Sequence, residues 1–337
     1  MQYKAVAQRS VALLLAFGLM SAGCSKGSSA TSPENAVPSA PQASAGATPT
    51  SESPAVTYPP DSGPLPQIDS KRTMQYIKEI VAFGPRPMGS ANHKKLENYI
   101  LAHLKGDQVE DDAFTADTVE GKFPVHNIIA KYPGTKDGVI VILGHYDTNY
   151  PLRDTGYVGA NDGGSSTAIL LEYANQLRGK KRDGYSVWLV WSDGEEAVRQ
   201  WTDTDSLYGT RHLAETWEKD GTLKKIKALL VMDMIADADL NIDRDTNSTA
   251  WLADLIYEAA TRSGVQSHFY ARTGVISDDH LPFVKRGVPS IDVIDLDYGY
   301  NNVFHHTPED TLDKLSPRSL EIVGNTTLEA LRMLDRR

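Results

Sequence analysis

Short, continuous apolar runs recur along the chain, and they constrain its fold more than any other feature. Each is four or five residues long, which is shorter than an ordinary helix, and most are rich in β-branched residues. The runs cover residues 127–130, 139–143, 187–191, 228–232 and 290–294. Strands of this kind are buried on both faces, which is typical of a mainly parallel sheet covered by helices.

Segments with helical spacing of apolar residues lie between and around these runs. They cover residues 73–82, 91–104, 165–177, 206–219, 250–263 and 318–334. The alternation predicts an α/β fold of three layers, in which a central sheet, mixed but mainly parallel, has helices on both faces. Ligand sites in such folds form beyond the carboxyl ends of the strands.

The first 24 residues differ in composition from the rest of the chain. Lys4 and Arg9 give a basic start, residues 11–20 are almost wholly apolar, and small residues precede Cys24. This is the pattern of a secretory signal, and its apolar stretch is too short to span a bilayer as a stable helix. Because Cys24 directly follows Ala-Gly, the segment resembles a bacterial lipoprotein signal, which implies that Cys24 is lipidated and becomes the mature N-terminus.

This signal predicts an exported protein at the periplasmic face of a bacterial membrane, held there by its N-terminal lipid alone. Residues 25–65 are dominated by Ser, Ala, Pro, Thr and Gly, and they are predicted to form a disordered tether. Residues 66–337 are predicted to form the folded domain. Ordinary secretion with a free cysteine stays open as the alternative, because Ser21 stands where lipoprotein signals usually have Leu.

Cysteine content and net charge both narrow the possible chemistry. Cys24 is the only cysteine, so the predicted folded domain has no disulfide, no thiolate metal ligand and no cysteine nucleophile. Any metal ligands must therefore be His, Asp or Glu. The formal net charge of −10 disfavours nucleic acid as a partner, because nucleic-acid binding depends on Lys and Arg that neutralise phosphates.

Histidines and carboxylates gather where the predicted strands end. His145, the pair Glu195-Glu196, and Asp233 each follow a strand, while Asp162 and His306 lie in polar loops. One such carboxylate alone is more often a helix cap, but the set is what a borderline cation such as zinc requires. Without a cation these carboxylates would repel one another. Glu195 and Glu196 are neighbours whose side chains diverge, so one can bind metal while the other faces the substrate as a base.

Several longer strings carry a resemblance to a known family. Residues 84–337 resemble metallopeptidase family 28, whose fold is that of the zinc exopeptidases. The stretch Ser192-Asp193-Gly194-Glu195-Glu196-Ala197, then Trp201, then residues 205–213, is similar to glutaminyl-peptide cyclotransferases, also called glutaminyl cyclases. Residues 83–86 and 277–283 are similar to the same group. Trp201 and Leu207-Tyr208-Gly209 are specific to the cyclases, whereas the metal motifs are shared with aminopeptidases.

The resemblance implies a zinc-dependent acyltransferase that acts on peptide and protein N-termini, preferentially on glutamine, and releases ammonia to leave pyroglutamate. It implies that one zinc ion is held by Asp162, Glu196 and His306. It also implies that Glu195 is the acid and base.

The resemblance assigns further residues to the pocket. It makes Asp233 and Asp278 a hydrogen-bonded pair beside Glu195, and it makes Trp201 a pocket wall. His305 stands where animal cyclases have a tryptophan that lines the substrate pocket, so this part of the pocket departs from the family pattern.

Two other functions stay open. In a family 28 aminopeptidase, a second zinc would add His145 and Asp233 as ligands, Asp162 would bridge the two ions, and Asp147 would orient His145. All of these residues are present, so the ligand set does not separate the two enzymes. A non-catalytic, anchored binding protein is the third reading, and the intact Glu195 argues against it.

Overall fold

The computed structural model describes residues 63–337. The predicted signal peptide, Cys24 and all but the last three residues of the predicted tether lie outside the described residues. The helices are α1 (Ser70–Val81), α2 (Ala91–His103), α3 (Gly164–Leu177), α4 (Tyr208–Lys219), α5 (Ala250–Arg262), α6 (Leu281–Val284) and α7 (Pro317–Leu334). The strands are β1 (Gln108–Thr118), β2 (Gly121–Tyr132), β3 (Lys136–His145), β4 (Tyr185–Ser192), β5 (Ile226–Asp233), β6 (Ile242–Asp245), β7 (Phe269–Gly274) and β8 (Ser290–Ile294).

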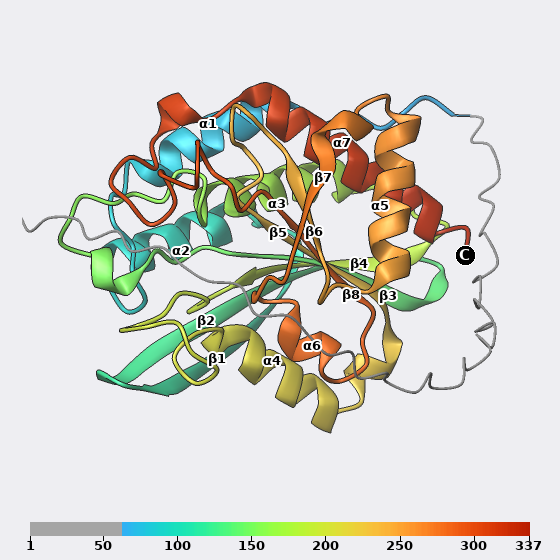
Figure 1. Cartoon of the computed structure of the whole chain (residues 1–337). Helices are drawn as coiled ribbons and strands as arrows, with labels where there is room; N and C mark the ends of the chain where they lie inside the picture. Colours follow the sequence, from blue (N-terminus) through green and yellow to red (C-terminus); the bar gives the residue numbers. More distant parts are fainter. Residues whose placement is uncertain (1–62) are drawn as a thin grey trace, which may run out of the picture. The chain divides into compact units, whose positions relative to one another are not determined.

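Six strands form the central sheet in the order β1-β2-β4-β3-β5-β8 (Figure 1). β3 is parallel to both of its neighbours, β4 and β5, and β5 is parallel to β8. The hairpin of β1 and β2 adds two antiparallel pairings at one edge. The predicted mixed, mainly parallel sheet is therefore confirmed, and the carboxyl ends of β3, β4 and β5 lie side by side.

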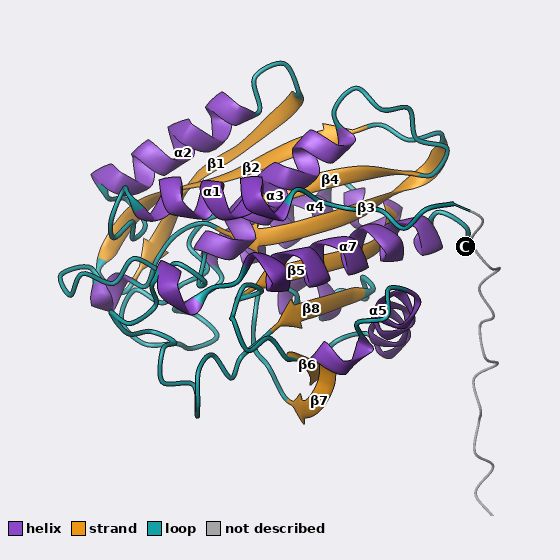
Figure 2. Ribbon diagram, turned by 90° about the horizontal axis from the view of Figure 1, so that it is seen from above, coloured by secondary structure: helices purple, strands orange, loops and turns teal. Residues whose placement is uncertain are grey.

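Helices cover both faces of the sheet, as the alternation along the sequence predicts. Figure 2 looks down on α1, α2, α3 and α7, which lie over one face, while α4 and α6 lie under the other (Figure 1). Alternate residues of each strand supply the two cores. Ile140 and Ile142 of β3 pack toward α3 and α7, whereas Val141 and Leu143 pack toward α4 and α6.

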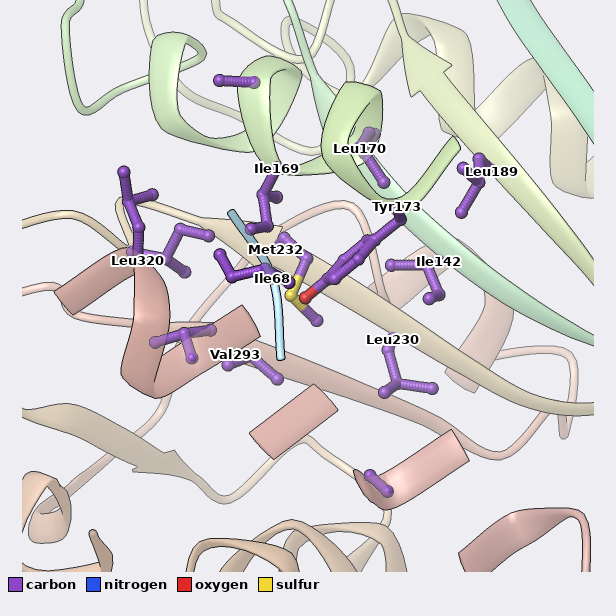
Figure 3. Close-up of a cluster of buried hydrophobic side chains, with 14 of the residues drawn as sticks. Ile68, Ile142, Ile169, Leu170, Tyr173, Leu189, Leu230, Met232, Val293 and Leu320 are labelled. Carbon is purple, nitrogen blue, oxygen red and sulfur yellow. The ribbon is translucent and has the colours of Figure 1, made fainter. Parts of the chain in front are cut away.

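The larger core lies between the sheet and the covering helices α1, α3 and α7 (Figure 3). Ile142, Leu189 and Leu230 reach it from three neighbouring strands, and Ile169 and Leu320 reach it from helices. Burial of one such side chain contributes roughly 1.5–3 kcal/mol to folding. This rigid layer fixes the positions of the strand ends.

The structure differs from the sequence prediction at three strands and at the start of one helix. β1 is an edge strand whose sequence contains Glu110, Asp111 and Asp112, so it has no apolar run to mark it. β6 and β7 pair in a small separate sheet that the pattern also missed. The predicted helix 206–219 begins two residues late, at Tyr208, because Leu207 has a φ of 53°, which no helical residue can adopt.

Side-chain caps explain several helix starts. Asp69, Ser90 and Ser316 each accept a backbone N–H from the first turn of α1, α2 and α7. Within residues 63–337, no helix combines the length and the apolar character needed to cross a membrane.

Candidate active site

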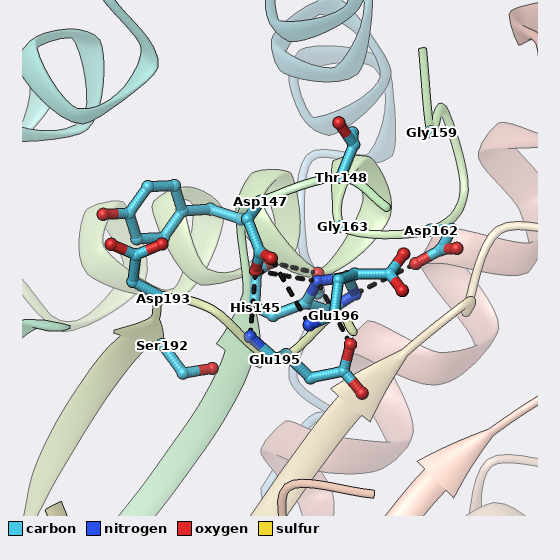
Figure 4. A network of polar contacts seen from close by, with 12 residues as sticks. His145, Asp147, Thr148, Gly159, Asp162, Gly163, Ser192, Asp193, Glu195 and Glu196 are labelled. Atoms are coloured by element: carbon cyan, nitrogen blue, oxygen red, sulfur yellow. Dashed lines mark hydrogen bonds and ion pairs between the residues drawn. The ribbon is translucent and has the colours of Figure 1, made fainter. Parts of the chain in front are cut away.

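The site lies at the carboxyl ends of β3, β4 and β5, where the sequence predicts it (Figure 4). His145 is the last residue of β3, and Asp233 is the last residue of β5. Glu195 and Glu196 follow β4 by three and four residues. Because β3 lies between β4 and β5 in the sheet, these side chains from distant parts of the chain come together.

Asp147 organises the loop after β4. One of its carboxylate oxygens accepts the Glu195 N–H at 3.2 Å and the other accepts the Glu196 N–H at 3.3 Å (Figure 4). Gly194 precedes this pair with a φ of 64°, and an added Cβ there would meet the Met88 sulfur at 2.9 Å. The glycine and the carboxylate thus fix a backbone on which Glu195 and Glu196 make different contacts.

His306 lies against both Glu196 and Asp162. The Nε2 atom of His306 lies 3.1 Å from Oε1 of Glu196 and 3.3 Å from Oδ2 of Asp162. The other oxygen of Glu196 accepts the Asn149 side-chain N–H at 2.8 Å, and the Tyr157 hydroxyl donates to Asp162. His306 has a φ of 52°, a strained conformation of the kind found at functional sites. The structure therefore brings together the three predicted zinc ligands.

A second set of donors shares Asp162 with the first. Nε2 of His145 lies 3.1 Å from Oδ1 of Asp162 and 3.3 Å from Oδ1 of Asp233. One ligand atom from each of these three residues lies within 4.8 Å of the others, and the same holds for Asp162, His305 and His306. Asp147 lies beside this set, with Oδ1 3.5 Å from Nδ1 of His145, although that nitrogen forms no hydrogen bond.

The electrostatics of these donors fit a divalent cation. Burial opposes protonation of His306, but Glu196 and Asp162 raise its pKa to about 11. Burial likewise opposes ionisation of Asp162, yet His145 and His306 hold its pKa well below the ordinary value. The carboxylates of Asp162 and Glu196 are therefore stabilised by positive charge nearby, and protonated histidines supply that charge. A divalent cation would supply the same charge and leave the histidines neutral, the form in which they bind metal.

Glu195 faces a cavity of about 320 Å³ that opens beside the donors. Asp162, Asp233, His305 and His306 line the same cavity. Burial raises the pKa of Glu195 well above the ordinary value; the nearby Asp278 and Glu196 add to the rise, and His145 opposes it. A buried carboxyl with a raised pKa beside a cavity is a candidate general acid and base.

Trp201 and Asp278 also line this cavity, as the resemblance implies. The hydrogen bond expected between Asp233 and Asp278 stays a prediction. One oxygen of Asp278 accepts the Asp279 N–H, and Oδ1 of Asp233 lies 3.3 Å from Nε2 of His145. A hydrogen bond between two carboxyls requires a proton on one of them. Burial and the charge of Asp233 raise the pKa of Asp278 well above the ordinary value, which favours a proton on Asp278.

His305 is held by a neighbouring amide. The Asn302 side-chain oxygen accepts the Tyr298 N–H at 3.2 Å, so its NH₂ group faces Nδ1 of His305 at 3.0 Å. A donor at Nδ1 places the proton of neutral His305 on Nε2, which lies 4.0 Å from Oδ2 of Asp162 and lines the cavity. The residue that replaces the tryptophan of animal cyclases is therefore a hydrogen-bond donor.

Buried residues that hold the site together had no assigned role in the sequence analysis. Arg86 is fully buried and donates to the backbone oxygens of Tyr146 at 3.1 Å and Gly159 at 2.8 Å. Asp310 accepts the backbone N–H groups of Asn161 at 2.8 Å and Asp162 at 3.2 Å. Such residues lie singly in loops, so no periodic pattern marks them.

Gly163 explains the tight approach of this loop to the sheet. It has a φ of 74°, and an added Cβ would lie 2.6 Å from the Asp147 backbone oxygen and 3.1 Å from the His145 ring. Only glycine fits between these groups, so Asp162 can reach the end of β3 immediately before α3 begins.

Residues 127–331 match the model of peptidase family M28. The chain belongs to this peptidase family. Among its M28 relatives, the glutaminyl-peptide cyclotransferase of Drosophila melanogaster is 32% identical over 253 residues, which cover 67% of this chain and 70% of the relative. The predicted family is therefore confirmed.

Solved structures of similar proteins agree with this M28 assignment. The crystal structure of a glutaminyl cyclase from an Acidobacteriales bacterium is 49% identical, with a TM-score of 0.80, and the match covers 83% of this chain and 99% of that one. A Zn-dependent exopeptidase from Parabacteroides distasonis is 25% identical with a TM-score of 0.71, and the match covers 81% and 100% of the two chains. The predicted zinc exopeptidase-like fold is confirmed.

Proposed function

We propose that the protein is a zinc-dependent glutaminyl-peptide cyclotransferase, which converts an N-terminal glutamine to pyroglutamate and releases ammonia. One observation carries the proposal: the buried acid Glu195 faces the same cavity as the donor residues Asp162 and His306. The similarity to a bacterial glutaminyl cyclase at 49% identity supports the choice among the reactions that such a site could perform.

Proton transfer is the task of Glu195. The α-amine of the substrate attacks the γ-carbonyl carbon, a C–N bond of the lactam forms, and the C–N bond to the amide nitrogen breaks. Glu195 accepts the proton that the amine loses and delivers it to the departing ammonia. Its raised pKa suits both roles, because a general acid and base works best when its pKa lies near the working pH.

Asp162, Glu196 and His306 would hold the ion, and their nitrogen and carboxylate donors are those that zinc prefers. When bound, zinc supplies a Lewis acid for the γ-carbonyl oxygen. Trp201 and His305 line the cavity that would receive the glutamine side chain, and His305 would direct its Nε2–H toward a substrate oxygen. Because nucleophile and electrophile belong to one residue, the site needs only to fold that residue back on itself.

The location of the enzyme is also part of the proposal. The signal-like residues 1–24 support export, and lipidation of Cys24 would hold the folded domain at the periplasmic face of a bacterial membrane. Peptide and protein N-termini in that compartment would be its substrates.

Replacement of the proton carrier tests the proposal. In the variant Glu195→Gln, zinc content should stay at the wild-type level, because Glu195 belongs to neither strand-end donor set. Ammonia release from a glutamine peptide should fall by about 10²–10⁴-fold, the usual contribution of general acid–base catalysis. Zinc content is measured by atomic absorption and ammonia by a coupled assay. Wild-type turnover in the zinc-loaded variant would refute the assignment of Glu195.

A family 28 aminopeptidase is the second candidate. The donor set of His145, Asp162 and Asp233 favours it, because a second zinc ion could bind there. In that reaction Glu195 would activate a water molecule that attacks the first peptide bond. The product separates the two candidates: a cyclase keeps the chain length and releases ammonia, whereas an aminopeptidase removes the first residue.

A further inference from the structure

A second cavity of about 280 Å³ lies next to the active-site cavity. Ser277 lines both cavities. The same two segments, residues 201–207 and 275–282, contribute to the walls of both cavities. The Trp201 loop contributes Trp201 to the first cavity and Asp203, Ser206 and Leu207 to the second. Because the walls are shared, the second cavity continues the first as an outer groove, bounded further out by α4 and α6, which lie side by side under the sheet (Figure 1).

The outer groove carries two cations that form no ion pair with a carboxylate of residues 63–337. Arg211 donates only to backbone oxygens, those of Ser206 at 3.0 Å and Thr204 at 3.2 Å. The ammonium group of Lys285 forms neither an ion pair nor a hydrogen bond within residues 63–337. Both side chains line the groove.

The other charges of the groove largely cancel. Arg286 pairs with Glu218 at 3.0 Å, and Glu215 pairs with Lys219 at 2.5 Å. Asp203 is the remaining acid that lines the groove, beside the two cations Arg211 and Lys285. The groove therefore has an excess of positive charge, in contrast to the carboxylate-rich cavity beside it.

We infer that the outer groove is a subsite for the residues that directly follow the N-terminal residue of the substrate, and that it favours a carboxylate there. This inference rests on the proposed function, because it places the first residue beside Glu195 and the following chain across Ser277. The carboxylate can come from an acidic side chain or from the C-terminus of a short peptide, since Arg211 and Lys285 recognise both alike.

Equilibrium binding of peptides to the zinc-loaded Glu195→Gln protein tests the subsite. The peptides begin with glutamine, are amidated at the C-terminus and carry Glu, Gln or Lys at the second, third or fourth position. At one position, Glu should bind about three- to tenfold more tightly than Lys, which is the size expected of partly exposed ion pairs. A tetrapeptide with a free C-terminus, compared with its amide, reports on the terminal carboxylate.

Charge reversal at the groove supplies the matched comparison. Lys285→Glu, added to Glu195→Gln, should reduce the ratio of Glu-peptide to Lys-peptide affinity to one or below. Lys180→Glu makes the same change of net charge at an exposed residue that follows the end of α3, outside the groove, and should leave the ratio unchanged. The ratio of the two affinities is compared because a variant that weakens the binding of both peptides equally leaves this ratio unchanged.

Equal affinity for Glu and Lys peptides at every position, or equal shifts from the two lysine variants, would overturn the subsite. The peptide chain would then leave over the exposed Val275, which also lines the active-site cavity. Because binding does not depend on which bond the wild-type enzyme breaks, this failure is distinct from failure of the proposed function, which only the product of the wild-type enzyme decides.

Discussion

The active-site cavity and the outer groove are neighbours of similar volume but opposite construction. The first stands on the ends of buried strands, and its acids Asp162, Glu195 and Asp278 are almost completely buried. The second is built from a loop and two helices, and its cations Arg211 and Lys285 keep contact with solvent. The charged groups of the active-site cavity are held rigidly in a low-dielectric environment, where electrostatic interactions are strong.

The exposed charges of the groove work in water, where each ion pair contributes little. Changes to the first region should therefore abolish the reaction, whereas changes to the second should only shift preference among substrates. The loop that carries Trp201 joins the two, so a change within it should affect both.

Removal of the metal should have the largest effect. A chelator should abolish ammonia release, and added zinc should restore it, because the proposed reaction needs a Lewis acid at the γ-carbonyl oxygen. At a free zinc concentration one hundred times the Kd, binding should raise the free energy of unfolding by about 3 kcal/mol, which a thermal melt with and without zinc would detect. Full activity in the chelated protein would contradict the metal assignment.

Asp205→Asn should have a smaller effect than metal removal, and it should affect both the active-site cavity and the outer groove. Asp205 accepts the backbone N–H groups of Val198 and Arg199 at 3.0 Å and of Gln200 at 2.9 Å, and so fixes the loop that carries Trp201. Asparagine turns one acceptor into a donor, which should lower the free energy of unfolding by about 1–3 kcal/mol and raise the KM. Urea unfolding and steady-state kinetics measure these changes.

The same substitution carries a pH signature. Burial opposes ionisation of Asp205, but the N–H groups and the Tyr208 hydroxyl hold its pKa below the ordinary value. A depressed folded-state pKa gives stability that is present above the unfolded pKa, about 3.9, and is lost as pH falls through the folded value. The difference between wild type and Asp205→Asn should therefore be largest near neutral pH and shrink in acid.

Asp203→Asn is the matched control, because Asp203 is exposed in the same loop and its carboxylate accepts none of these N–H groups. An equal loss of stability in both variants would show that net charge, rather than the hydrogen bonds of Asp205, accounts for the effect.

The apolar runs predicted the central strands and most helices because buried elements leave a strong periodic signal. The ends of those runs also located the site, since parallel strands bring distant polar residues to one edge. β1 escaped prediction because an exposed edge strand needs charge rather than an apolar run. The late start of α4 depends on the backbone of Leu207, a property that no side-chain pattern records.

Within the site, the motifs predicted the candidate metal ligands and the candidate acid and base. They predicted fewer of the residues that orient those side chains. Tyr157 and Asn149 orient the carboxylates of Asp162 and Glu196 from loops without any pattern. The hydrogen bond between Asp233 and Asp278 stays a prediction, and the structure adds that Asp233 also lies against His145. The outer groove was not predicted at all, because it depends on which helices meet in space. The roles of the zinc ligands and of Glu195 stay predictions.

The product formed from a short peptide that begins with glutamine tests the central claim most directly. The purified, zinc-loaded protein is incubated with the peptide, and the product is identified by mass spectrometry against the spontaneous reaction. The account predicts loss of ammonia with the chain length unchanged. Loss of the whole first residue would contradict it, and would indicate an aminopeptidase with a second zinc ion at His145 and Asp233.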